Sequence, residues 1–387
     1  MGFRVMNKQT TNLDVAKSHA DQLRDELQVL AQAPADAPRG LSGQFYHDAG
    51  LFEHECKTVL RQGWHCVGRA DELAKTGDYL TLHLLGEPLI VARGDDGIKA
   101  LSNVCRHRGM PLVEGQGNAK RFICRYHAWA YGIDGALLRA PRMENAGFDP
   151  KTCKLGEFHC EQRFGFIYVC LADVAPDIDA DLAGLAEVIG QYQPEEFGIV
   201  HSASEVWNCN WKCLVENFME GYHLSVVHPQ TLHGYTPTGL SRKGPNGPGF
   251  TSYFANYPQD IASRGEGAPG LDEQARNRSS LFAAFPCQVA SVASSLLVSL
   301  SIRPLTSNSI EVRWTMSVYG GSLDDETIEQ RVALWNEVNR EDREKLEAMQ
   351  VALGSVHATG GPLASDDYEG TVRDFLLWLA RKDEVAA

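Results

Sequence analysis

The 387-residue sequence has no long hydrophobic run, and nothing in it approaches the ~20 consecutive apolar residues that span a bilayer. The N-terminal segment MGFRVMNKQTTNLDVAKSHADQL lacks the apolar core of a secretion signal, and Met6 stands where N-myristoylation requires Ser or Thr. Basic residues are also scarce, since 36 Lys and Arg face 50 Asp and Glu, and the resulting charge of −14 disfavours nucleic-acid binding. These absences predict a cytoplasmic protein with neither a membrane nor a nucleic-acid partner.

Two further absences concern cofactors. No Gly-x-Gly-x-x-Gly motif follows a predicted strand and opens a helix, so we expect no nicotinamide or flavin dinucleotide site in this chain. The cysteine spacing of plant-type ferredoxins is missing as well. The ten cysteines are not expected to form a disulfide framework in a reducing cytosol, and most should be small buried hydrophobic residues. Two of them, Cys105 and Cys124, have neighbours that indicate another role.

The pattern of apolar residues divides the chain into unlike parts and predicts an α+β protein. Short segments with strand-like alternation run from residue 64 to about 172, and longer helical patterns dominate the second half. We therefore expect an N-terminal helical segment over 1–43 that packs on the last domain, a small all-β domain over 44–175, and an antiparallel sheet with long helices over 176–387. Within these, 173–185 is predicted as a linker and 234–272 as loop, with helices at 13–33, 50–63, 205–230, 323–350 and 367–382 and strands at 287–303 and 309–318.

Four possible metal ligands lie in the β-rich part, in two short groups. The first is Cys105-Arg-His107 and the second, sixteen residues later, is Cys124-Arg-Tyr-His127. Two thiolates and two imidazoles can hold one zinc ion tetrahedrally, or a [2Fe–2S] cluster with both Cys on one iron and both His on the other. Conventional zinc fingers pair Cys with Cys and His with His along the chain, whereas each group here supplies one of each. This arrangement favours the cluster.

A second group of possible ligands lies in the segment ENFMEGYHLSVVHP. His223 and His228 are five residues apart, which places them about 140° from each other on a regular helix. A shared ion therefore requires the helix to distort or end between them, and Pro229 is consistent with such an end. Taken alone, this spacing also fits two unrelated surface histidines.

Together these motifs resemble those of Rieske non-haem iron oxygenases, in the α or terminal oxygenase subunit of the ring-hydroxylating dioxygenase and betaine-demethylase type. CRHRGMPL and ICRYHAWAYGIDG resemble the cluster-binding loops, although Arg125 stands where Pro is usual. The segment over 216–228 resembles the iron motif E/D-N-x-x-E/D-x-Y-H-x4-H. EDREKLEAMQ resembles the family's E-D-x4-E-A-x-Q, whose Asp is an iron ligand; this implies Asp342 as the third ligand, with Glu341 as the alternative.

The resemblance also implies a helix-grip fold for the last domain and a role for each residue of the motifs. Glu220 would connect His223 to the cluster ligand His127 of a neighbouring chain in a homotrimer. A carboxylate in this position accepts the second N–H of the ligating imidazole and thereby fixes its tautomer. Asn217 would lie beside the iron, although packing or capping explains it equally well. The implied ligands are Cys105, His107, Cys124 and His127 for the cluster and His223, His228 and Asp342 for the mononuclear Fe(II).

The function implied by the resemblance is that of a terminal oxygenase, which uses O2 and electrons supplied from NAD(P)H by a separate reductase with flavin and iron–sulfur groups, directly or through a ferredoxin. Glu220 and its short spacing to the histidines favour hydroxylation or N-demethylation of a betaine-like amine; hydroxylation of an aromatic acid is the alternative. The aromatic residues over 232–257, with Phe282 and Phe285, would line the pocket and suit either substrate. Competing classes are a Rieske electron-transfer protein without catalysis and a binding module with a degenerate metal site.

Overall fold

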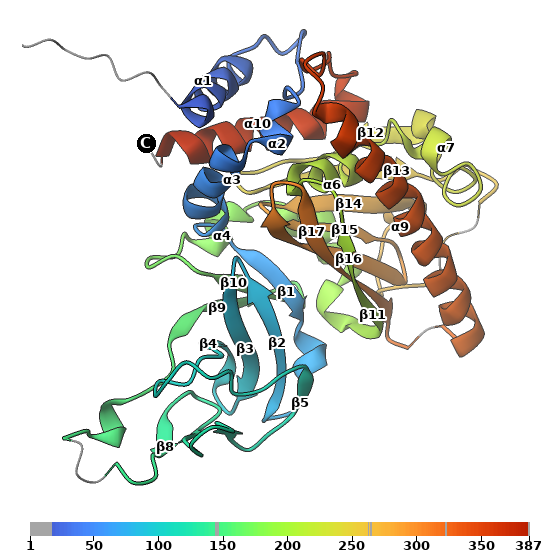
Figure 1. Cartoon of the computed structure of the whole chain (residues 1–387). Coiled ribbons are helices and arrows are strands. Elements are labelled where there is room, and N and C mark those ends of the chain that lie inside the picture. The colour runs from blue at the N-terminus through green and yellow to red at the C-terminus, as the bar shows by residue number, and fades with distance from the viewer. Residues whose placement is uncertain (1–17, 144–146, 262, 264, 322, 386–387) are drawn as a thin grey trace, which may run out of the picture.

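The computed structural model describes residues 18–143, 147–261, 263, 265–321 and 323–385, which form two lobes (Figure 1). One lobe is all β and comes from the earlier part of the chain. The other combines an antiparallel sheet with the long helices α9 (Asp325–Leu353) and α10 (Asp366–Val385). Among the described residues no helix is both long and apolar enough to cross a membrane. The α+β class predicted from the sequence is confirmed.

The β lobe is built on an antiparallel seven-stranded sheet in the order β1-β10-β9-β4-β3-β2-β5. Leu85 and Gly86 have φ values of +50° and +84° in the turn between β2 and β3, as the mirror-image turns of tight hairpins require. A small sheet, β6-β7-β8, lies at the end of this lobe away from the long helices (Figure 1). The strands are β1 (His65–Arg69), β2 (Asp78–Leu84), β3 (Glu87–Gly94), β4 (Gly97–Ser102), β5 (Gln116–Asn118), β6 (Phe122–Ile123), β7 (Ala130–Tyr131), β8 (Leu137–Arg139), β9 (Glu157–Arg163) and β10 (Phe166–Cys170).

The second lobe has its own antiparallel sheet, in the order β11-β17-β16-β15-β14-β13-β12. Side chains alternate between the two faces of a sheet, and here each face has its own hydrophobic core. Tyr253 and Leu281 pack with the helices α6 (Trp211–Phe218), α9 and α10, whereas Phe250 and Phe282 pack with α4 (Ile178–Asp181) and α5 (Leu185–Ile189). The strands are β11 (Phe197–Trp207), β12 (Ser241–Lys243), β13 (Phe250–Asn256), β14 (Arg278–Ala284), β15 (Gln288–Val292), β16 (Leu296–Thr306) and β17 (Ser309–Tyr319).

The N-terminal helices pack on the second lobe. Ser18 and Asp21 form a capping box at the start of α1 (His19–Ala31), which lies against α10, and residues 13–17 of the helix predicted there fall outside the described residues. α2 (Gln44–His47), α3 (Ala49–Glu55) and a π-helical turn (Cys56–Leu60) follow. Phe45, Tyr46 and Leu51 join the same hydrophobic core as α6, α9 and α10. The predicted start of the all-β domain at residue 44 therefore lies inside a segment that packs on the second lobe.

Four segments differ from their predicted secondary structure. The predicted linker over 173–185 folds into α4 and leads into α5, and it buries Ile178 and Leu182. The first residues of the helix predicted from residue 205 belong instead to the end of β11, and the predicted loop over 234–272 contains β12 and β13. The strand β14 has no counterpart among the predicted elements. Every residue of β14 is buried, so the alternation that signals a strand is absent from its sequence.

Candidate metal centres

The two loops with the Cys-x-His and Cys-x-x-His motifs have equivalent backbones. In each loop the Cys N–H donates to the carbonyl five residues later, and the N–H four residues later donates to the Cys carbonyl. The fourth residue after each Cys has a left-handed conformation, at Gly109 (φ +75°) and at Ala128 (φ +58°). Cys105 and Cys124 are buried, whereas His107 and His127 are exposed. Each loop thus holds a thiol on the inside and presents an imidazole to solvent.

The side chains between these loops fit a two-iron cluster better than a single zinc ion. The Nδ1 atoms of His107 and His127 face each other at 3.1 Å, so one metal ion can bind both. A tetrahedral zinc ion, with ligands at about 2.0–2.3 Å, would require all four donor atoms within about 4 Å of one another. Among the described residues the four do not form such a group, even at a limit of 4.8 Å. The separation of the thiols from the imidazoles suits a cluster with two irons.

Aromatic residues hold these loops in place. The His107 ring stacks on the buried Trp129, with ring centroids 5.0 Å apart and planes 6° apart. The buried Tyr131 hydroxyl accepts a hydrogen bond from the Arg106 N–H at 3.0 Å and lies 3.4 Å from Cys105 Sγ. Burial, followed by the contact with Cys105, raises the pKa of Tyr131, so its hydroxyl stays protonated and can donate to a thiolate. Trp129 and Tyr131 therefore fix the positions of the two loops by packing and hydrogen bonding.

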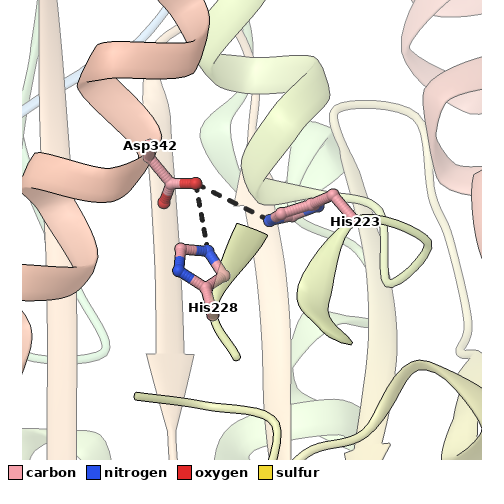
Figure 2. A group of neighbouring side chains, drawn as sticks. All are labelled: His223, His228 and Asp342. Carbon is pink, nitrogen blue, oxygen red and sulfur yellow. Dashed lines mark ion pairs between the residues drawn. The ribbon is translucent and has the colours of Figure 1, made fainter. Parts of the chain in front are cut away.

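The second centre is assembled from two segments that are distant in the sequence. α6 begins at its N-cap Asn210, ends at Phe218, and is followed by a loop that leads to His223. His223 and His228 are the N-cap and C-cap residues of the short helix α7 (Leu224–Val227), so both lie at its ends, and the helix ends at His228 as expected. Asp342 points toward them from the middle of α9 (Figure 2). Glu341 and Asp342 are adjacent residues on that helix and therefore point in different directions.

His223, His228 and Asp342 converge on one point (Figure 2). Asp342 Oδ1 lies 3.1 Å from His228 Nε2 and 3.7 Å from His223 Nε2. Among the described residues these form the one group of three or more His, Cys, Asp or Glu side chains whose donor atoms all lie within 4.8 Å of one another. Two imidazoles and a carboxylate are the donor set of non-haem iron sites with open positions.

A buried oxygen without a hydrogen bond supports the assignment of this group as a metal site. Asp342 Oδ1 is buried and has no hydrogen-bond partner among the described residues, although it faces the two Nε2 atoms. An unpaired buried carboxylate oxygen carries a large desolvation cost unless a cation binds it. A metal ion between Asp342 and the two imidazoles would remove that cost, so the residues present fit a mononuclear iron.

The far nitrogen of each histidine is held by a carboxylate. His223 Nδ1 lies 2.5 Å from Glu220 Oε1, and His228 Nδ1 lies 2.8 Å from Glu341 Oε2. The Thr231 hydroxyl donates to the same Glu341 oxygen at 2.7 Å. These contacts direct both Nε2 atoms to the centre. Glu341, which the sequence offered as an alternative ligand, instead holds a ligand in place; its orienting role was not foreseen, because no local motif relates it to a histidine 113 residues away.

The carboxylates also control the charge of the histidines. Burial lowers the pKa of His223, but the hydrogen bond and charge of Glu220 and the charge of Asp342 outweigh it, so the pKa is raised. The pKa of His228 is likewise raised, because the close, charged Asp342 carboxylate and the hydrogen bond to Glu341 outweigh burial. In the absence of a cation both imidazoles thus tend to hold protons. Metal binding would displace these protons, since a ligating imidazole must be neutral at the bound nitrogen.

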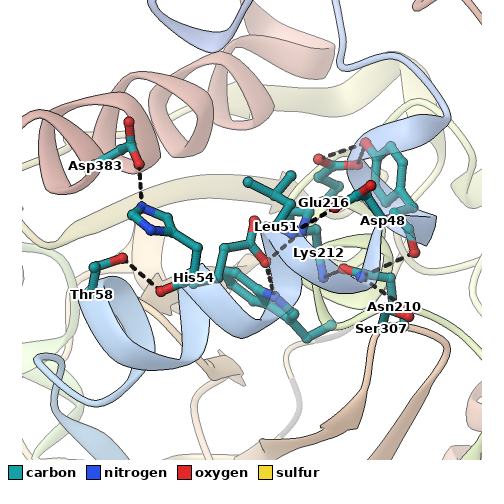
Figure 3. Close-up of polar contacts among 12 residues, drawn as sticks. Asp48, Leu51, His54, Thr58, Asn210, Lys212, Glu216, Ser307 and Asp383 are labelled. Carbon is teal, nitrogen blue, oxygen red and sulfur yellow. Dashed lines mark hydrogen bonds and ion pairs between the residues drawn. The ribbon is translucent and has the colours of Figure 1, made fainter. Parts of the chain in front are cut away.

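A buried polar network that sequence reasoning missed joins α6 to the N-terminal helices α2 and α3 (Figure 3). Lys212 Nζ donates to both Glu55 oxygens at 2.7 and 2.8 Å, and the Trp211 indole donates to the same carboxylate at 3.1 Å. The Tyr46 hydroxyl donates to Glu216 at 2.8 Å, and burial raises the pKa of Glu216 to about 7 despite that hydrogen bond and the charge of Lys212. Lys212 and Glu55 are 157 positions apart in the sequence, so no local pattern reveals their pairing.

Several predicted neighbours of the iron site have other positions. Asn217 is partly buried, with its Nδ2 atom unpaired among the described residues. The aromatic residues expected in the pocket divide between the two faces of the sheet: Tyr253 lies on the face of the iron ligands, where burial and then the charges of Glu220 and Asp342 raise its pKa. Phe250, Phe254 and Phe282 belong to the opposite face. The prediction was wrong for these three because it took the segment to be a loop, whereas strands send alternate side chains to opposite faces.

Comparison with known families agrees with this geometry. Residues 63–159 match the model of the Rieske [2Fe-2S] domain, and residues 192–383 match the ring hydroxylating alpha subunit (catalytic domain). The chain belongs to the Rieske oxygenases of the ring-hydroxylating α-subunit type. The family's cofactors are a [2Fe–2S] cluster and a mononuclear iron, so the predicted cofactors are confirmed for this Rieske oxygenase chain.

Some relatives are named for quaternary ammonium compounds, and others are named for aromatic hydrocarbons. The chain is 37% identical over 194 residues to the carnitine monooxygenase oxygenase subunit of Escherichia coli (strain K12), covering 49% of this chain and 52% of that protein. It is 35% identical over 219 residues to the glycine betaine monooxygenase oxygenase subunit of Chromohalobacter salexigens, covering 54% and 49%. These matches span about half the length of the curated relatives.

Solved structures resemble the whole fold. The quaternary ammonium Rieske monooxygenase CntA in complex with γ-butyrobetaine superimposes with a TM-score of 0.80 at 23% identity, over 92% of this chain and 98% of that chain. Naphthalene 1,2-dioxygenase from Rhodococcus sp. bound to indole gives a TM-score of 0.81 at 18% identity, over 94% and 98%. Since both structures are equally similar, the fold alone does not select the substrate.

Proposed function

We propose that this Rieske oxygenase is the terminal oxygenase of a multicomponent system that oxidises a quaternary ammonium compound. When bound, the cluster stores single electrons and the iron binds and activates O2. The overall reaction inserts one oxygen atom into a C–H bond of the substrate and reduces the other to water, with two electrons and two protons consumed. The observation that carries the proposal is the convergence of His223, His228 and Asp342 in a chain that also has the Cys and His ligands of a Rieske cluster.

We propose a specific role for each site residue. Cys105, His107, Cys124 and His127 hold the cluster, and His223, His228 and Asp342 hold the iron. Glu220 and Glu341 keep the Nε2 atoms of the two iron-site histidines directed at the metal, as their hydrogen bonds to the Nδ1 atoms indicate. Asn217, a residue of α6 whose buried Nδ2 atom has no hydrogen-bond partner among the described residues, would lie beside the iron.

The charge of the site favours a cationic substrate. Glu220, Glu341 and Asp342 surround the iron position, and no Lys or Arg of the described chain forms an ion pair with them. Arg340 and Arg343, beside them in the sequence, pair with glutamates elsewhere. The excess negative charge of these carboxylates would attract the quaternary ammonium end of a substrate toward the iron position.

Two basic residues of β12 are already engaged in ion pairs. Lys243 Nζ lies 3.1 Å from Asp374 and 3.2 Å from Asp366, and Arg242 pairs with Asp367 at 3.8 Å. These ion pairs join β12 to α10, and they do not discriminate between a betaine and an aromatic acid. The relatives active on carnitine and glycine betaine support a quaternary ammonium substrate.

We further propose that the oxygenase is a homotrimer in which Glu220 connects His223 with His127 of a neighbouring chain. Within one chain the cluster loops lie at the end of the β lobe away from α7 (Figure 1), so the two centres are not adjacent. His127 is exposed and can reach a neighbour. Exposed apolar side chains flank both centres, Tyr126 at 54% exposure and Val226 at 82%, as a subunit contact would require. Inter-subunit electron transfer is described for the structurally similar CntA.

We propose a cytoplasmic location and slightly revised domain limits. None of the ten cysteines forms a disulfide, which suits a reducing compartment. The helices over 18–60 share a hydrophobic core with α6, α9 and α10, so residues 18–60 and 176–385 are assigned to the iron domain and 61–175 to the Rieske domain. Electrons would come from NAD(P)H through a separate reductase with flavin and iron–sulfur groups, with or without a ferredoxin.

One experiment tests the substrate class. The purified protein, reduced anaerobically with dithionite and freed of excess reductant, is mixed with O2 and either γ-butyrobetaine, carnitine, glycine betaine or benzoate, and products are measured by mass spectrometry. We expect hydroxylated or demethylated product only from a quaternary ammonium compound. Product from benzoate alone would contradict the proposal. Metal analysis should give about three irons per chain; two would indicate an electron carrier without catalysis.

A further inference from the structure

The buried face of α9 carries polar side chains on both sides of Asp342, and the two sides differ. On the C-terminal side, both donors of the buried Gln350 amide are used: Nε2 donates to the Tyr46 carbonyl at 3.1 Å and to Asn308 Oδ1 at 2.7 Å. On the N-terminal side, Trp335 is 5% exposed and Asn339 is 4% exposed. Trp335 Nε1 and Asn339 Nδ2 nevertheless have no hydrogen-bond partner among the described residues. Buried donors without an acceptor are rare in folded proteins, because each carries a desolvation cost.

The same contrast is found on α6, which packs against α9. The buried N-cap Asn210 donates from Nδ2 to the Ser307 carbonyl at 2.8 Å, and its backbone N–H donates to Gln350 Oε1 at 2.9 Å. About two turns later, Asn217 has a buried Nδ2 atom without a partner in the part of the chain that the structure describes. Both helices thus have hydrogen-bonded amides at the end where they contact each other and unpaired N–H groups farther along.

The unpaired donors lie on the side of the iron position. The two helices run antiparallel, because the start of α6 contacts Gln350 and the chain after α6 reaches Asp342 through His223. With 3.6 residues per turn, Trp335 points within about 20° of the direction of Asp342, and Asn339 within about 60°. Along the helix axis they lie about 10.5 Å and about 4.5 Å from Asp342. The donors therefore follow the iron ligand along the same face of α9.

We propose that Trp335, Asn339 and Asn217 bind the carboxylate of a zwitterionic substrate whose ammonium end lies at the iron position. The inference concerns the same site and rests on the proposed function. A carboxylate accepts several hydrogen bonds on its two oxygens, and its charge strengthens each of them. The three donors are neutral amide and indole N–H groups. Unlike Lys or Arg, they can bind a substrate carboxylate without forming an ion pair with Asp342, which the iron needs as a ligand.

A molecule with two opposite charges fits the distribution of charge at this site. Glu220, Glu341 and Asp342 attract its ammonium end, and the donors on α9 lie one and two turns away from Asp342. A quaternary ammonium ion without a carboxylate would make the first contact and leave the N–H groups unpaired. A site that hydrogen-bonds a substrate group discriminates against an analogue without that group, because its own buried polar atoms then lack partners. We therefore expect selectivity for a betaine over a simple quaternary ammonium ion of equal length.

The test compares two ligands that differ in the carboxylate, namely γ-butyrobetaine and n-butyltrimethylammonium. Their binding to the full-length protein with its cluster and iron is measured by calorimetry without O2. The variants Asn339→Leu and Trp335→Phe each remove N–H donors and keep a side chain of similar size. Trp207→Phe is the control, because Trp207 is also buried with an unpaired Nε1 among the described residues but lies beside the other half of α9, where the neighbouring Asn208 N–H donates to Glu347.

We expect the wild-type protein to bind γ-butyrobetaine at least about tenfold more tightly than n-butyltrimethylammonium. Asn339→Leu and Trp335→Phe should each raise the Kd of γ-butyrobetaine about tenfold and change that of n-butyltrimethylammonium less than about twofold. Trp207→Phe should bind both ligands as wild type does. An equal loss of affinity for both ligands in the α9 variants would show that the donors have a structural role, and would overturn the inference.

The comparison of the two ligands in the wild-type protein does not depend on the folding of any variant. Equal Kd values for γ-butyrobetaine and n-butyltrimethylammonium in that protein would also overturn the inference. Turnover of the chemically reduced protein with O2 separates this result from a failure of the proposed function. A wild-type protein that oxidises both ligands but binds them equally would overturn the inference alone. One that oxidises no quaternary ammonium compound would overturn the proposed function and, with it, the inference.

Discussion

The two metal centres are built in opposite ways. At the cluster, two short loops supply all four proposed ligands, the two imidazoles are exposed, and each loop follows the same backbone pattern. At the iron site the proposed ligands come from segments more than 100 residues apart, His228 is 1% exposed, and two further carboxylates hold the histidines. A site that only accepts electrons can remain at the surface, whereas a site that activates O2 needs orientation and exclusion of water.

If the two centres form independently, removing one ligand from one centre should leave the other centre intact. This test has the largest expected effect. We expect Asp342→Ala to lose mononuclear iron and to reduce turnover to below about 1% of wild type, since three protein ligands are needed for an open iron site. Rieske absorption and the EPR signal of the reduced cluster should remain. Cys124→Ser should give the reverse, with the cluster lost and the iron kept. Glu344→Ala on the same helix is the control. If Glu341→Ala abolishes iron binding and Asp342→Ala does not, the ligand assignment is wrong.

The second test concerns the buried polar network around Lys212, Glu55 and Glu216. The cluster has no counterpart to this network within the described residues. Lys212→Met leaves the Glu55 carboxylate buried without its cation, so we expect the free energy of unfolding to fall by about 3–5 kcal/mol. The double variant Lys212→Met with Glu55→Leu should recover most of this loss. Urea unfolding followed by far-UV circular dichroism measures both. Equal instability of the single and double variants would show that packing, not charge, determines the effect.

The third test uses pH on the same network. Glu216 has a folded-state pKa of about 7, above its ordinary 4.5, so the native state binds its proton more tightly and loses stability as pH rises from about 4.5 to 7. Glu216→Gln cannot ionise and should not lose this contribution. We expect the variant's stability relative to wild type to increase by about 3 kcal/mol between pH 5 and 8. Parallel stability curves for the two proteins over that range would contradict the raised pKa.

The fourth test addresses the connection between the two centres. Glu220→Gln keeps a hydrogen-bonding oxygen beside His223 but removes the charge, and we expect both metals to remain bound while reoxidation of the reduced cluster with substrate and O2 slows about 10–100-fold. Rapid-mixing absorption kinetics measure this, and the mass in solution should still be that of a trimer. A wild-type rate in the variant, or a fully active monomer, would exclude the proposed connection between chains.

The smallest effect is expected in the cluster loops. Gly109 and Ala128 occupy equivalent left-handed positions, and a Cβ at Gly109 would have open space, with nothing within 4 Å. Gly109→Ala should therefore cost only the backbone strain of about 1 kcal/mol and leave the cluster spectrum unchanged. Thermal unfolding monitored at the visible absorption of the cluster is the measurement. Loss of the cluster in this variant would mean that the two loops are not equivalent.

The contrast between the centres also explains what the sequence could predict. The cluster ligands and the two histidines of the iron site lie in short motifs, and the long helices have clear periodicity, so all of these were recognisable. Asp342 required the family pattern, because α9 carries many other acidic residues. Glu341, Thr231 and the Lys212–Glu55 pair act across more than 100 residues and leave no local signal. The central strand β14 was missed because burial of both its faces removes alternation.

The way in which the chain enters and leaves the β lobe has a consequence for biosynthesis. The Trp64 indole donates to the Pro176 carbonyl at 3.0 Å, and β1 pairs with β10, so the β lobe begins and ends at one place. The helices before it share a core with α10 at the other end of the chain. On the ribosome, the Rieske domain is thus complete long before the iron domain, whose first helices must wait until α10 has been made. Cluster insertion can therefore precede formation of the iron site in each newly made chain.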